Sequence, residues 1–166
     1  CHIGGNLATN AGGLRVIRYG HARNWVLGLE AVLMDGQVLQ LGGSTVKDNA
    51  GWDLKQLFIG SEGIFGVITA AVLQLTPLPA SPVVSVLALP SVADGLEVLK
   101  ELERSSAIIL SAAELVSAAC LDAVCERHGR QPPLQTALPW YLLLELEAQD
   151  QTESMVIDVL AQTVEA

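Results

Sequence analysis

The stretch CHIGGNLATNAGGLRVIRYG, residues 1–20, is the most unusual part of the sequence. It holds five glycines, two asparagines and one threonine, and few residues that could pack in a core. Glycine lets backbone N–H groups approach a ligand closely and turn through positive φ, and successive N–H groups then form a concave surface that favours anions. Residues 3–13, IGGNLATNAGG, therefore predict either a ligand-binding loop or an ordinary glycine-rich surface turn.

Three polar side chains in this stretch, Asn6, Thr9 and Asn10, could add hydrogen bonds to a polar ligand. The stretch is not a dinucleotide-binding fingerprint, because that motif requires Gly-x-Gly-x-x-Gly between a strand and a helix. It is not a P-loop either, since no Gly-Lys-Ser/Thr ends it. The ligand is therefore not identified by either of these two motifs.

A second candidate is GSEGIFGVIT, residues 60–69. Its three glycines at intervals of three lead into a strand that we expect to be buried, and they permit the backbone to approach a flat ligand. Glu62 could accept a hydrogen bond from a hydroxyl or an amine. The alternative interpretation is a helix C-terminal cap followed by a β-bulge.

A β-hairpin is predicted between these two candidates. WVLGLEAVLMDGQVLQL, residues 25–41, has two strand-forming runs on either side of Asp35-Gly36. This dipeptide favours a type I′ turn, in which both central residues have positive φ.

The segment after the hairpin predicts a loop and then a short helix. In residues 44–60, STVKDNAGWDLKQLFIG, we expect Asp53 as the N-cap, one or two helical turns, and Gly60 as the stop. FGVITAAVLQLTPLP, residues 65–79, predicts an apolar strand ended by prolines.

Three prolines in TPLPASP, residues 76–82, mark the predicted domain boundary. Beyond it, strands are expected at 83–89, 107–116 and 140–148, alternating with helices. The first helix should run from Ser91 to about Ser105 with a capping-box-like start at Ser91 and Asp94, and with an apolar face made of Val92, Leu96, Leu99 and Leu102. The second helix ends at Gly129 and carries, at helical spacing, Leu121, Val124, Cys125 and His128. The third helix begins near Thr152, and its inward-facing residues are Val156, Val159, Leu160 and Thr163. This order predicts an α+β, ferredoxin-like layer.

Composition excludes several classes of function. The chain has 166 residues and a net charge of −9 with scattered basic residues, which argues against nucleic acid as a partner. Hydrophobic residues make up 51% and aromatic residues 4%, so the core should consist mainly of aliphatic side chains. No apolar run reaches the roughly 20 residues of a membrane span. The chain lacks an initiator Met and a signal-peptide pattern, so we expect an interior piece without its targeting region.

The cysteines and histidines do not suggest a metal site. Cys1, Cys120 and Cys125 have no paired spacing, which predicts reduced thiols in a reducing compartment. Cys120 and Cys125 lie five residues apart on a predicted helix, and we expect them to pack in a core. The three histidines form no metal-ligand spacing with them, and we expect His2 and His21 to have structural or loop roles. No catalytic and no metal-binding residue is predicted in this chain.

Three segments together carry a specific resemblance. CHIGGNLATNAGGLRVIRYG, VLGLEAVLMDGQVL and KDNAGWDLKQLFIGSEGIFGVIT, in this order and spacing, resemble the FAD-linked oxidases of the vanillyl-alcohol oxidase and p-cresol methylhydroxylase (PCMH) superfamily. Within it, they are most similar to the D-2-hydroxyacid dehydrogenases. The departures are mild: Trp52 stands where the family often has Tyr, and Glu-Gly-Ile-Phe-Gly replaces the commoner Glu-Gly-Thr-Leu-Gly.

The resemblance implies an α+β fold with two parts. Residues 1–79 would be the second half of a PCMH-type FAD-binding domain, and residues 80–166 the start of a ferredoxin-like substrate (cap) domain. FAD would lie along two groups of residues. The flavin, ribityl and pyrophosphate would contact Gly4, Gly5, Asn6, Thr9, Asn10, Gly12 and Gly13, bordered by Tyr19 and Gly20; the adenosine end would contact Glu62, Gly63, Gly66, Val67 and Ile68.

The resemblance also implies what the whole protein does. It would oxidise a D-2-hydroxyacid, such as D-2-hydroxyglutarate, D-lactate or glycolate, to the 2-oxoacid by hydride transfer to FAD. A divalent metal such as zinc would be bound outside this chain, where the catalytic residues would also lie. A flavoprotein or a quinone would accept the electrons. The resemblance allows a homodimer as the oligomeric state of the whole protein. It agrees with a location either in the bacterial cytoplasm or in the mitochondrial matrix. Two alternatives stay open: an oxidase of the same superfamily acting on another alcohol or a sugar lactone, and a non-catalytic domain.

Overall fold

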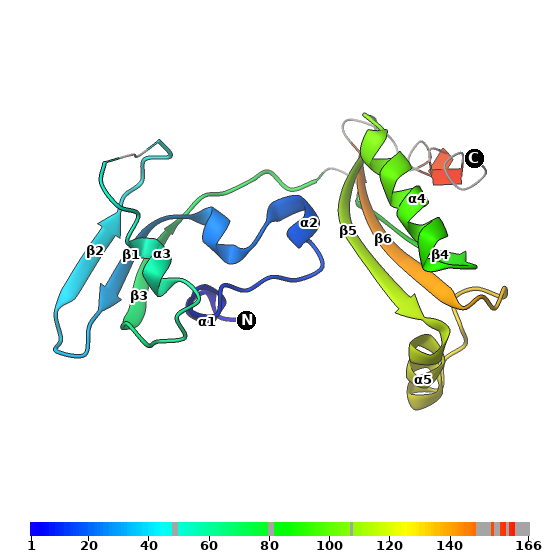
Figure 1. Cartoon of the computed structure of the whole chain (residues 1–166), viewed down its shortest axis with the longest axis horizontal. Helices are drawn as coiled ribbons and strands as arrows, with labels where there is room; N and C mark the ends of the chain where they lie inside the picture. The colour runs from blue at the N-terminus through cyan, green and yellow to red at the C-terminus, as the bar shows by residue number, and fades with distance from the viewer. Residues whose placement is uncertain are drawn as a thin grey trace. The chain divides into compact units, whose positions relative to one another are not determined.

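The computed structural model describes residues 1–47, 50–79, 82–106 and 108–148, together with residues 154, 157, 158, 160 and 161. The chain forms two compact units, each built on its own three-stranded sheet (Figure 1). The first unit comprises Cys1–Gly13 and Tyr19–Pro77; the second comprises Leu14–Arg18 and Leu78–Ala166. Among the described residues, no helix has both the length and the apolar character needed to cross a membrane.

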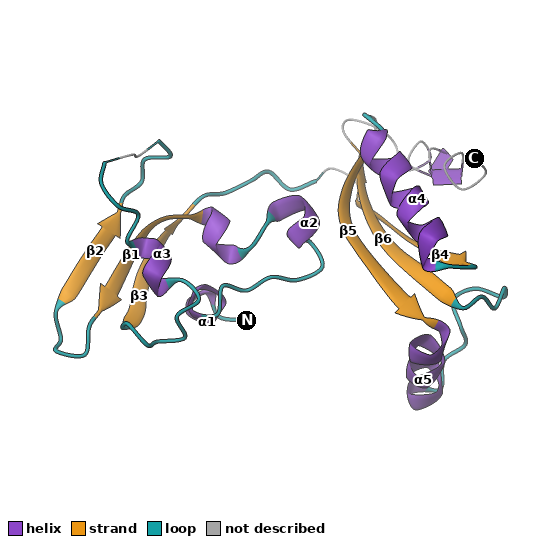
Figure 2. Cartoon of the chain, in the orientation of Figure 1, coloured by secondary structure: helices purple, strands orange, loops and turns teal. Residues whose placement is uncertain are grey.

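The first unit contains an antiparallel sheet in the order β2-β1-β3 (Figure 2). Its central strand β1 (Val26–Val32) pairs with β2 (Val38–Gly42) and with β3 (Val67–Leu73). Short helices accompany it, namely α1 (Ile3–Ala8), α2 (Val16–Tyr19, of which only Tyr19 belongs to this unit), the 3₁₀ helix η1 (Ala22–Trp25) and α3 (Lys55–Phe58). The buried core consists of Leu7, Val26, Leu29, Ala31, Phe58 and Ile59.

The predicted hairpin is confirmed, but the type I′ turn is wrong. Gly36 has φ 84°, whereas Asn10 and Glu62 are the only described non-glycine residues with positive φ, so Asp35 does not adopt it. The Gly36 N–H donates to the Leu33 carbonyl (3.0 Å), and the Asp35 carboxylate accepts from the Gln37 N–H (3.0 Å). A turn followed by one left-handed glycine thus closes the hairpin, which is the pattern of three-residue loops.

Two further expectations for this unit are corrected. Strand β3 contains no buried residue, because it is an edge strand whose Val67 is 61% exposed. Asp53 is not the N-cap of α3: Leu54 holds that position without a side-chain cap bond. The Asp53 carboxylate binds the Lys55 ammonium instead (2.6 Å), and an ion pair of this kind outcompetes a neutral backbone N–H. The helix does end before Gly60, which has φ 83°.

The second unit has the predicted alternation of strands and helices. Strands β4 (Pro82–Leu89) and β5 (Ile108–Ser117) both pair antiparallel with β6 (Trp140–Ala148), giving the order β4-β6-β5. Because β6 lies between two strands that are parallel to each other, β4-α4-β5 is a split βαβ unit, as in ferredoxin-like folds. The α+β class is confirmed. Ala80, Ser81 and Ala107, which belong to the predicted boundary and strand, lie outside the described residues.

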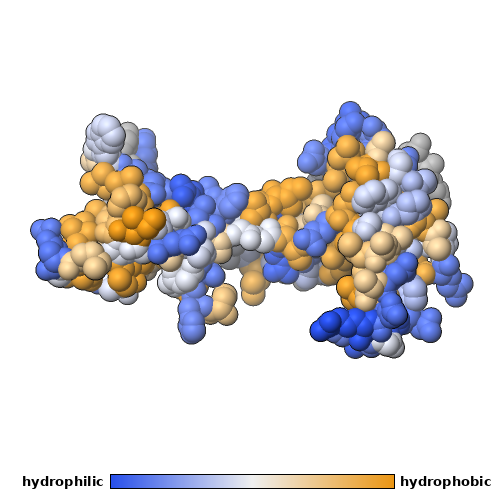
Figure 3. Space-filling model, turned by 60° about the horizontal axis from the view of Figure 1, so that its bottom comes forward, coloured by the Kyte–Doolittle hydropathy of each residue, from blue (hydrophilic) through white to orange (hydrophobic). Residues whose placement is uncertain are grey.

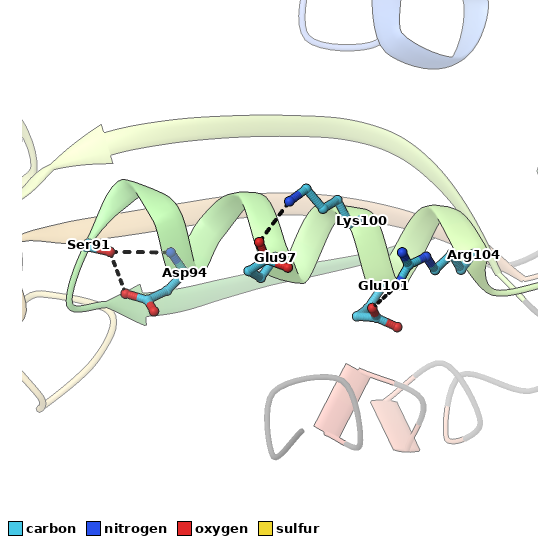
Figure 4. A network of polar contacts seen from close by, with 6 residues as sticks. All are labelled: Ser91, Asp94, Glu97, Lys100, Glu101 and Arg104. Atoms are coloured by element: carbon cyan, nitrogen blue, oxygen red, sulfur yellow. Dashed lines mark hydrogen bonds and ion pairs between the residues drawn. The ribbon is translucent and has the colours of Figure 1, made fainter.

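Helix α4 (Val92–Arg104) begins at the predicted cap. Ser91 Oγ accepts from the Asp94 N–H (3.3 Å) and donates to the Asp94 carboxylate (2.6 Å), and two surface ion pairs, Glu97–Lys100 and Glu101–Arg104, follow along the helix (Figure 4). The bond from the Asp94 N–H to Ser91 pairs a backbone N–H group in the first turn of the helix that would otherwise lack a partner.

The predicted apolar face of α4 is partly wrong. Val92 and Leu96 are 39% and 53% exposed, whereas the buried residues of the helix are Gly95, Val98 and Leu102. A Cβ added to Gly95 would lie 3.0 Å from the Leu89 side chain. The absence of a side chain at this position lets α4 approach β4 closely, and this contact decides which face is buried.

Helix α5 (Ala118–His128) ends at Gly129, which has φ 60°, as predicted. The expectation that Cys120 and Cys125 pack in a core is wrong, because α5 buries no residue: Cys120 is exposed and Cys125 is half-buried. Figure 1 shows α5 beyond the end of β5, where no layer covers it.

The predicted third helix is described only in part. Ser154, Ile157, Asp158, Leu160 and Ala161 are helical, and Leu160 is buried in the core of the second unit. Thr152, Val156, Val159 and Thr163 lie outside the described residues.

Candidate cofactor-binding site

The first glycine-rich stretch forms a short helix and not the predicted loop. Gly4 and Gly5 lie inside α1 and have no positive φ. The helix ends at Thr9, whose hydroxyl donates to the Gly5 carbonyl (2.9 Å), and Asn10 follows with φ 48°. Leu7, the buried residue of α1, anchors this short helix to the core, so tertiary packing outweighs the low helix propensity of glycine.

The second stretch has the backbone that its glycines predict. Gly60, Gly63 and Gly66 have φ values of 83°, 87° and 153°, and Glu62 between them has φ 52°. Conformations of this kind are rare for residues with a side chain. The turn from α3 into β3 therefore depends on glycine.

Hydrogen bonds join the two stretches, which are far apart in the sequence. The Gly60 N–H donates to the Leu7 carbonyl (3.0 Å), and the Glu62 N–H donates to the Ala8 carbonyl (2.9 Å). The end of α1 and the turn after α3 thus form one continuous piece of the first unit. The sequence treats them as separate motifs, and the structure brings them together.

Arg23 in η1 is a residue of this site that the sequence interpretation missed. Its backbone N–H donates to Asn10 Oδ1 (3.1 Å), and its Nη2 donates to the Ile59 carbonyl (3.0 Å). It thereby ties both stretches to the start of β1. No motif surrounds Arg23, so no sequence signal could have found it.

Exposed glycines leave room beside this surface. A Cβ built on Gly4, Gly5, Gly13 or Gly63 would meet no atom within 4 Å. Gly12 and Glu62 are also exposed, and Asn6 and Ile68 are half-buried. A flat or extended ligand could approach the backbone here without displacing protein atoms.

Gly66 differs from the other predicted residues because it is buried. An added Cβ would lie 2.7 Å from the Val32 carbonyl oxygen and 3.3 Å from the Phe58 ring. The fold itself therefore requires glycine at this position.

Tyr19 and Gly20 are held by residues that follow them. The Tyr19 carbonyl accepts from Trp25 Nε1 (2.7 Å), and the two rings lie 6.2 Å apart. A Cβ on Gly20 would lie 2.6 Å from Asn24 Oδ1, which also accepts from the His21 N–H. His21 thus has a role in capping η1.

These residues fit one wall of a site for FAD. The cofactor has a flat ring system and a long polar chain, and the exposed glycines, the Asn6 amide and the Thr9 hydroxyl offer close approach and hydrogen bonds. Within the described part of the chain, no group of three or more His, Cys, Asp or Glu residues could hold a metal ion.

Removing the Asn10 side chain tests how this wall is held together. Asn10→Ala should lower the free energy of unfolding of the first unit by about 2 kcal/mol, because it loses a hydrogen bond and places alanine at positive φ. Asn10→Gly loses only the hydrogen bond and should cost about 1 kcal/mol. Urea titration of both variants measures the difference, and equal losses would contradict the assigned backbone strain.

Comparison with known proteins identifies the family of the chain. Residues 1–42 match the family described as "FAD binding domain", and residues 78–166 match "FAD linked oxidases, C-terminal domain". The chain is 50% identical over 145 residues to mitochondrial D-2-hydroxyglutarate dehydrogenase of Bos taurus, covering 87% of this chain and 26% of that protein. It is 41% identical over 153 residues to D-2-hydroxyglutarate dehydrogenase of Xanthomonas citri pv. viticola, covering 92% of this chain and 32% of that protein.

The fold is similar to that of a solved alkyldihydroxyacetonephosphate synthase, with a TM-score of 0.67 at 21% identity over 96% of this chain and 32% of the other. The chain spans between a quarter and a third of the length of the curated relatives just named. Both halves of the sequence match FAD-linked domains, and the second match alone covers more than half of the chain. The chain therefore belongs to the FAD-linked oxidases.

Proposed function

We propose that the glycine-rich surface of the first unit is one wall of the FAD site. The observation that carries this proposal is the pair of hydrogen bonds that joins Leu7 and Ala8 to Gly60 and Glu62, between the two stretches whose sequences resemble the family most. The exposed backbone around Gly4, Gly5 and Gly63 supports close contact with the cofactor. The proposed cofactor-binding residues are Gly4, Gly5, Asn6, Thr9, Asn10, Gly12, Gly13, Tyr19, Gly20, Glu62, Gly63, Gly66, Val67 and Ile68.

The whole protein, on this proposal, is a dehydrogenase of D-2-hydroxyacids. The relatives named above support D-2-hydroxyglutarate as the first candidate substrate, with D-lactate and glycolate next. When bound, FAD supplies the acceptor for the hydride that leaves C2 of the substrate. The residues of this chain bind and orient the cofactor, and no residue here is assigned as a base or a metal ligand.

Further parts of the proposal concern the organisation and partners of the protein. Residues 1–79 belong to the FAD-binding domain and residues 80–166 to the substrate domain. A flavoprotein or a quinone accepts the electrons. Light scattering on the full-length protein tests whether the active form is a homodimer. The relatives include mitochondrial and bacterial proteins, and either compartment agrees with this assignment.

The test uses the full-length protein held without oxygen. Its flavin absorbance is followed while D-2-hydroxyglutarate, D-lactate, the L-enantiomers of these two acids, and the achiral glycolate are added in turn. Bleaching by one D-acid alone, or by glycolate alone, supports the proposed reaction. A yellow protein that no acid bleaches favours an oxidase of another alcohol, and a colourless protein that cannot be reconstituted with FAD contradicts the proposal.

The 166-residue chain by itself should be inactive and bind FAD weakly or not at all. It spans only 26% of the Bos taurus relative, and apolar side chains beside the glycine turn, Ile64 and Phe65, are 78% and 53% exposed. Figure 3 shows that hydrophobic residues, in orange, are exposed on the surface of the chain. Equilibrium dialysis against FAD measures the affinity, and a stoichiometric yellow complex with turnover of a hydroxyacid would overturn this expectation.

A further inference from the structure

The first unit contains a pocket of about 750 Å³ that none of the proposed cofactor-binding residues lines. Its walls come from η1, β1, β2, the start of α3 with the segment that leads into it, and Gln74 after β3. This volume lies within the range of small-molecule sites, about 300–1,000 Å³. The pocket is therefore large enough for a ligand of its own.

The charged residues of this pocket leave one positive charge without a counterion. Its charged lining residues are Arg23, Asp53 and Lys55. The Lys55 ammonium lies 2.6 Å from the Asp53 carboxylate, and its hydrogen bond is the main cause that holds the pKa of Asp53 below its usual value, so these two charges offset each other. None of the ion pairs among the described residues includes Arg23, whose Nη2 donates only to a backbone carbonyl. The described residues that line the pocket therefore sum to one positive charge, although the whole chain carries a net charge of −9.

Two polar atoms of the pocket residues also lack partners. Arg23 Nε and Gln56 Oε1 are buried without a hydrogen bond in the described part of the chain. The Gln56 amide is oriented by its nitrogen, which donates to Asp53 Oδ2 (3.3 Å), so its oxygen is the free acceptor. A buried polar atom without a partner costs about 1–3 kcal/mol. A ligand that pairs with both atoms must therefore offer an anionic acceptor to the Arg23 guanidinium and a hydrogen-bond donor to Gln56 Oε1.

We propose that this pocket binds a small oxyanion that also carries an O–H group, such as hydrogen phosphate or a hydroxycarboxylate. An anionic oxygen of the ligand accepts from the Arg23 guanidinium, which suits oxyanions because of its planar array of donors. The ligand hydroxyl donates to Gln56 Oε1. Trp52 at the pocket is 91% exposed and offers an apolar surface to the remainder of the ligand. This site goes beyond the proposed function, because it uses neither FAD nor any of the residues proposed to bind FAD. Arg23 supports the glycine-rich surface through its backbone N–H and its Nη2, whereas the unpaired Nε belongs to the pocket proposal.

Isothermal titration calorimetry on the 166-residue chain tests the proposal with two matched pairs of probes at neutral pH. Phosphate is compared with sulfate, and 3-hydroxybutyrate with butyrate; the second member of each pair lacks the O–H group. At least one O–H-bearing anion should bind roughly 2- to 10-fold more tightly than its counterpart, which corresponds to one hydrogen bond. The pair of probes in which the O–H-bearing anion binds more tightly shows whether the ligand is inorganic or organic.

Three variants separate the contributions of the pocket residues. Gln56→Leu should remove the preference for the O–H group and keep anion binding, and Arg23→Met should weaken every anion by about 10-fold or more. Arg130→Met, which removes the same charge from an exposed loop of the second unit, should change nothing. If Arg23→Met does not fold, as judged by circular dichroism, the Gln56→Leu result decides. Absence of saturable binding by all four anions, or equal affinities within both pairs, would overturn the proposal whether or not the full-length protein proves to be a flavoenzyme.

Discussion

Replacing Gly66 by alanine is expected to lower the free energy of unfolding of the first unit by about 2–5 kcal/mol. Gly66 has φ 153°, which is strained for any residue with a side chain. The new Cβ would also lie 2.7 Å from the Val32 carbonyl oxygen, a backbone atom that cannot move without disturbing the pairing of β1 with β3. Strain and overlap therefore add at one position.

Amide hydrogen exchange in β1 and β3 measures this loss, because it reports on the first unit alone. Gly63→Ala is the matched control: Gly63 has φ 87° but its Cβ would meet nothing within 4 Å, so only backbone strain of about 1–2 kcal/mol applies. Equal effects of the two variants would show that the contact with Val32 does not constrain this turn. Both measurements are made without FAD, so they do not depend on the proposed cofactor role.

Replacing Leu102 by alanine should destabilise the second unit by about 3 kcal/mol, within the range of roughly 2–5 kcal/mol for large-to-small changes in cores. Leu102 is 1% exposed and packs in the core that includes Val98, Leu144 and Leu146. Residues of β6 on the other side of this contact are fully buried, so the cavity left by the substitution has little freedom to collapse.

Leu96→Ala on the same helix is the control for Leu102→Ala. Leu96 is 53% exposed, and its substitution should change the free energy of unfolding by no more than about 0.5 kcal/mol. Exchange of the β6 amides measures both variants. The sequence places the two leucines on one apolar face, so comparable losses would favour that prediction over the buried face seen in the structure.

Local chemistry accounts for the elements that the sequence predicts well. The strand runs at 83–89 and 140–148, the serine cap of α4 and the glycine stop of α5 all depend on interactions within a few residues. The glycines at 60, 63 and 66 are of the same kind, because positive φ is a property of the residue itself. Family membership follows from such segments, since their order and spacing are specific.

Where two local solutions compete, a neighbouring charge or the packing of the fold decides between them. Asp53 could cap α3 or pair with Lys55, and it pairs. The glycine-rich start could be a loop or a helix, and burial of Leu7 makes it a helix. In α4 the stripe through Val92 and Leu96 is a good amphipathic pattern, yet the close approach at Gly95 turns a different face inward.

The sequence by itself determined the strands of both units, the ends of the two long helices of the second unit, the glycine turn at residues 60–66, and the family to which the chain belongs. Only the tertiary structure decided that the Gly60 turn is hydrogen-bonded to the end of α1, that Arg23 links both, and that the Arg23 Nε lacks a partner beside a separate pocket. The physical reason is the range of the interactions. Backbone conformation and capping depend on adjacent residues, whereas hydrogen bonds between distant segments and the burial of charge depend on how the chain packs.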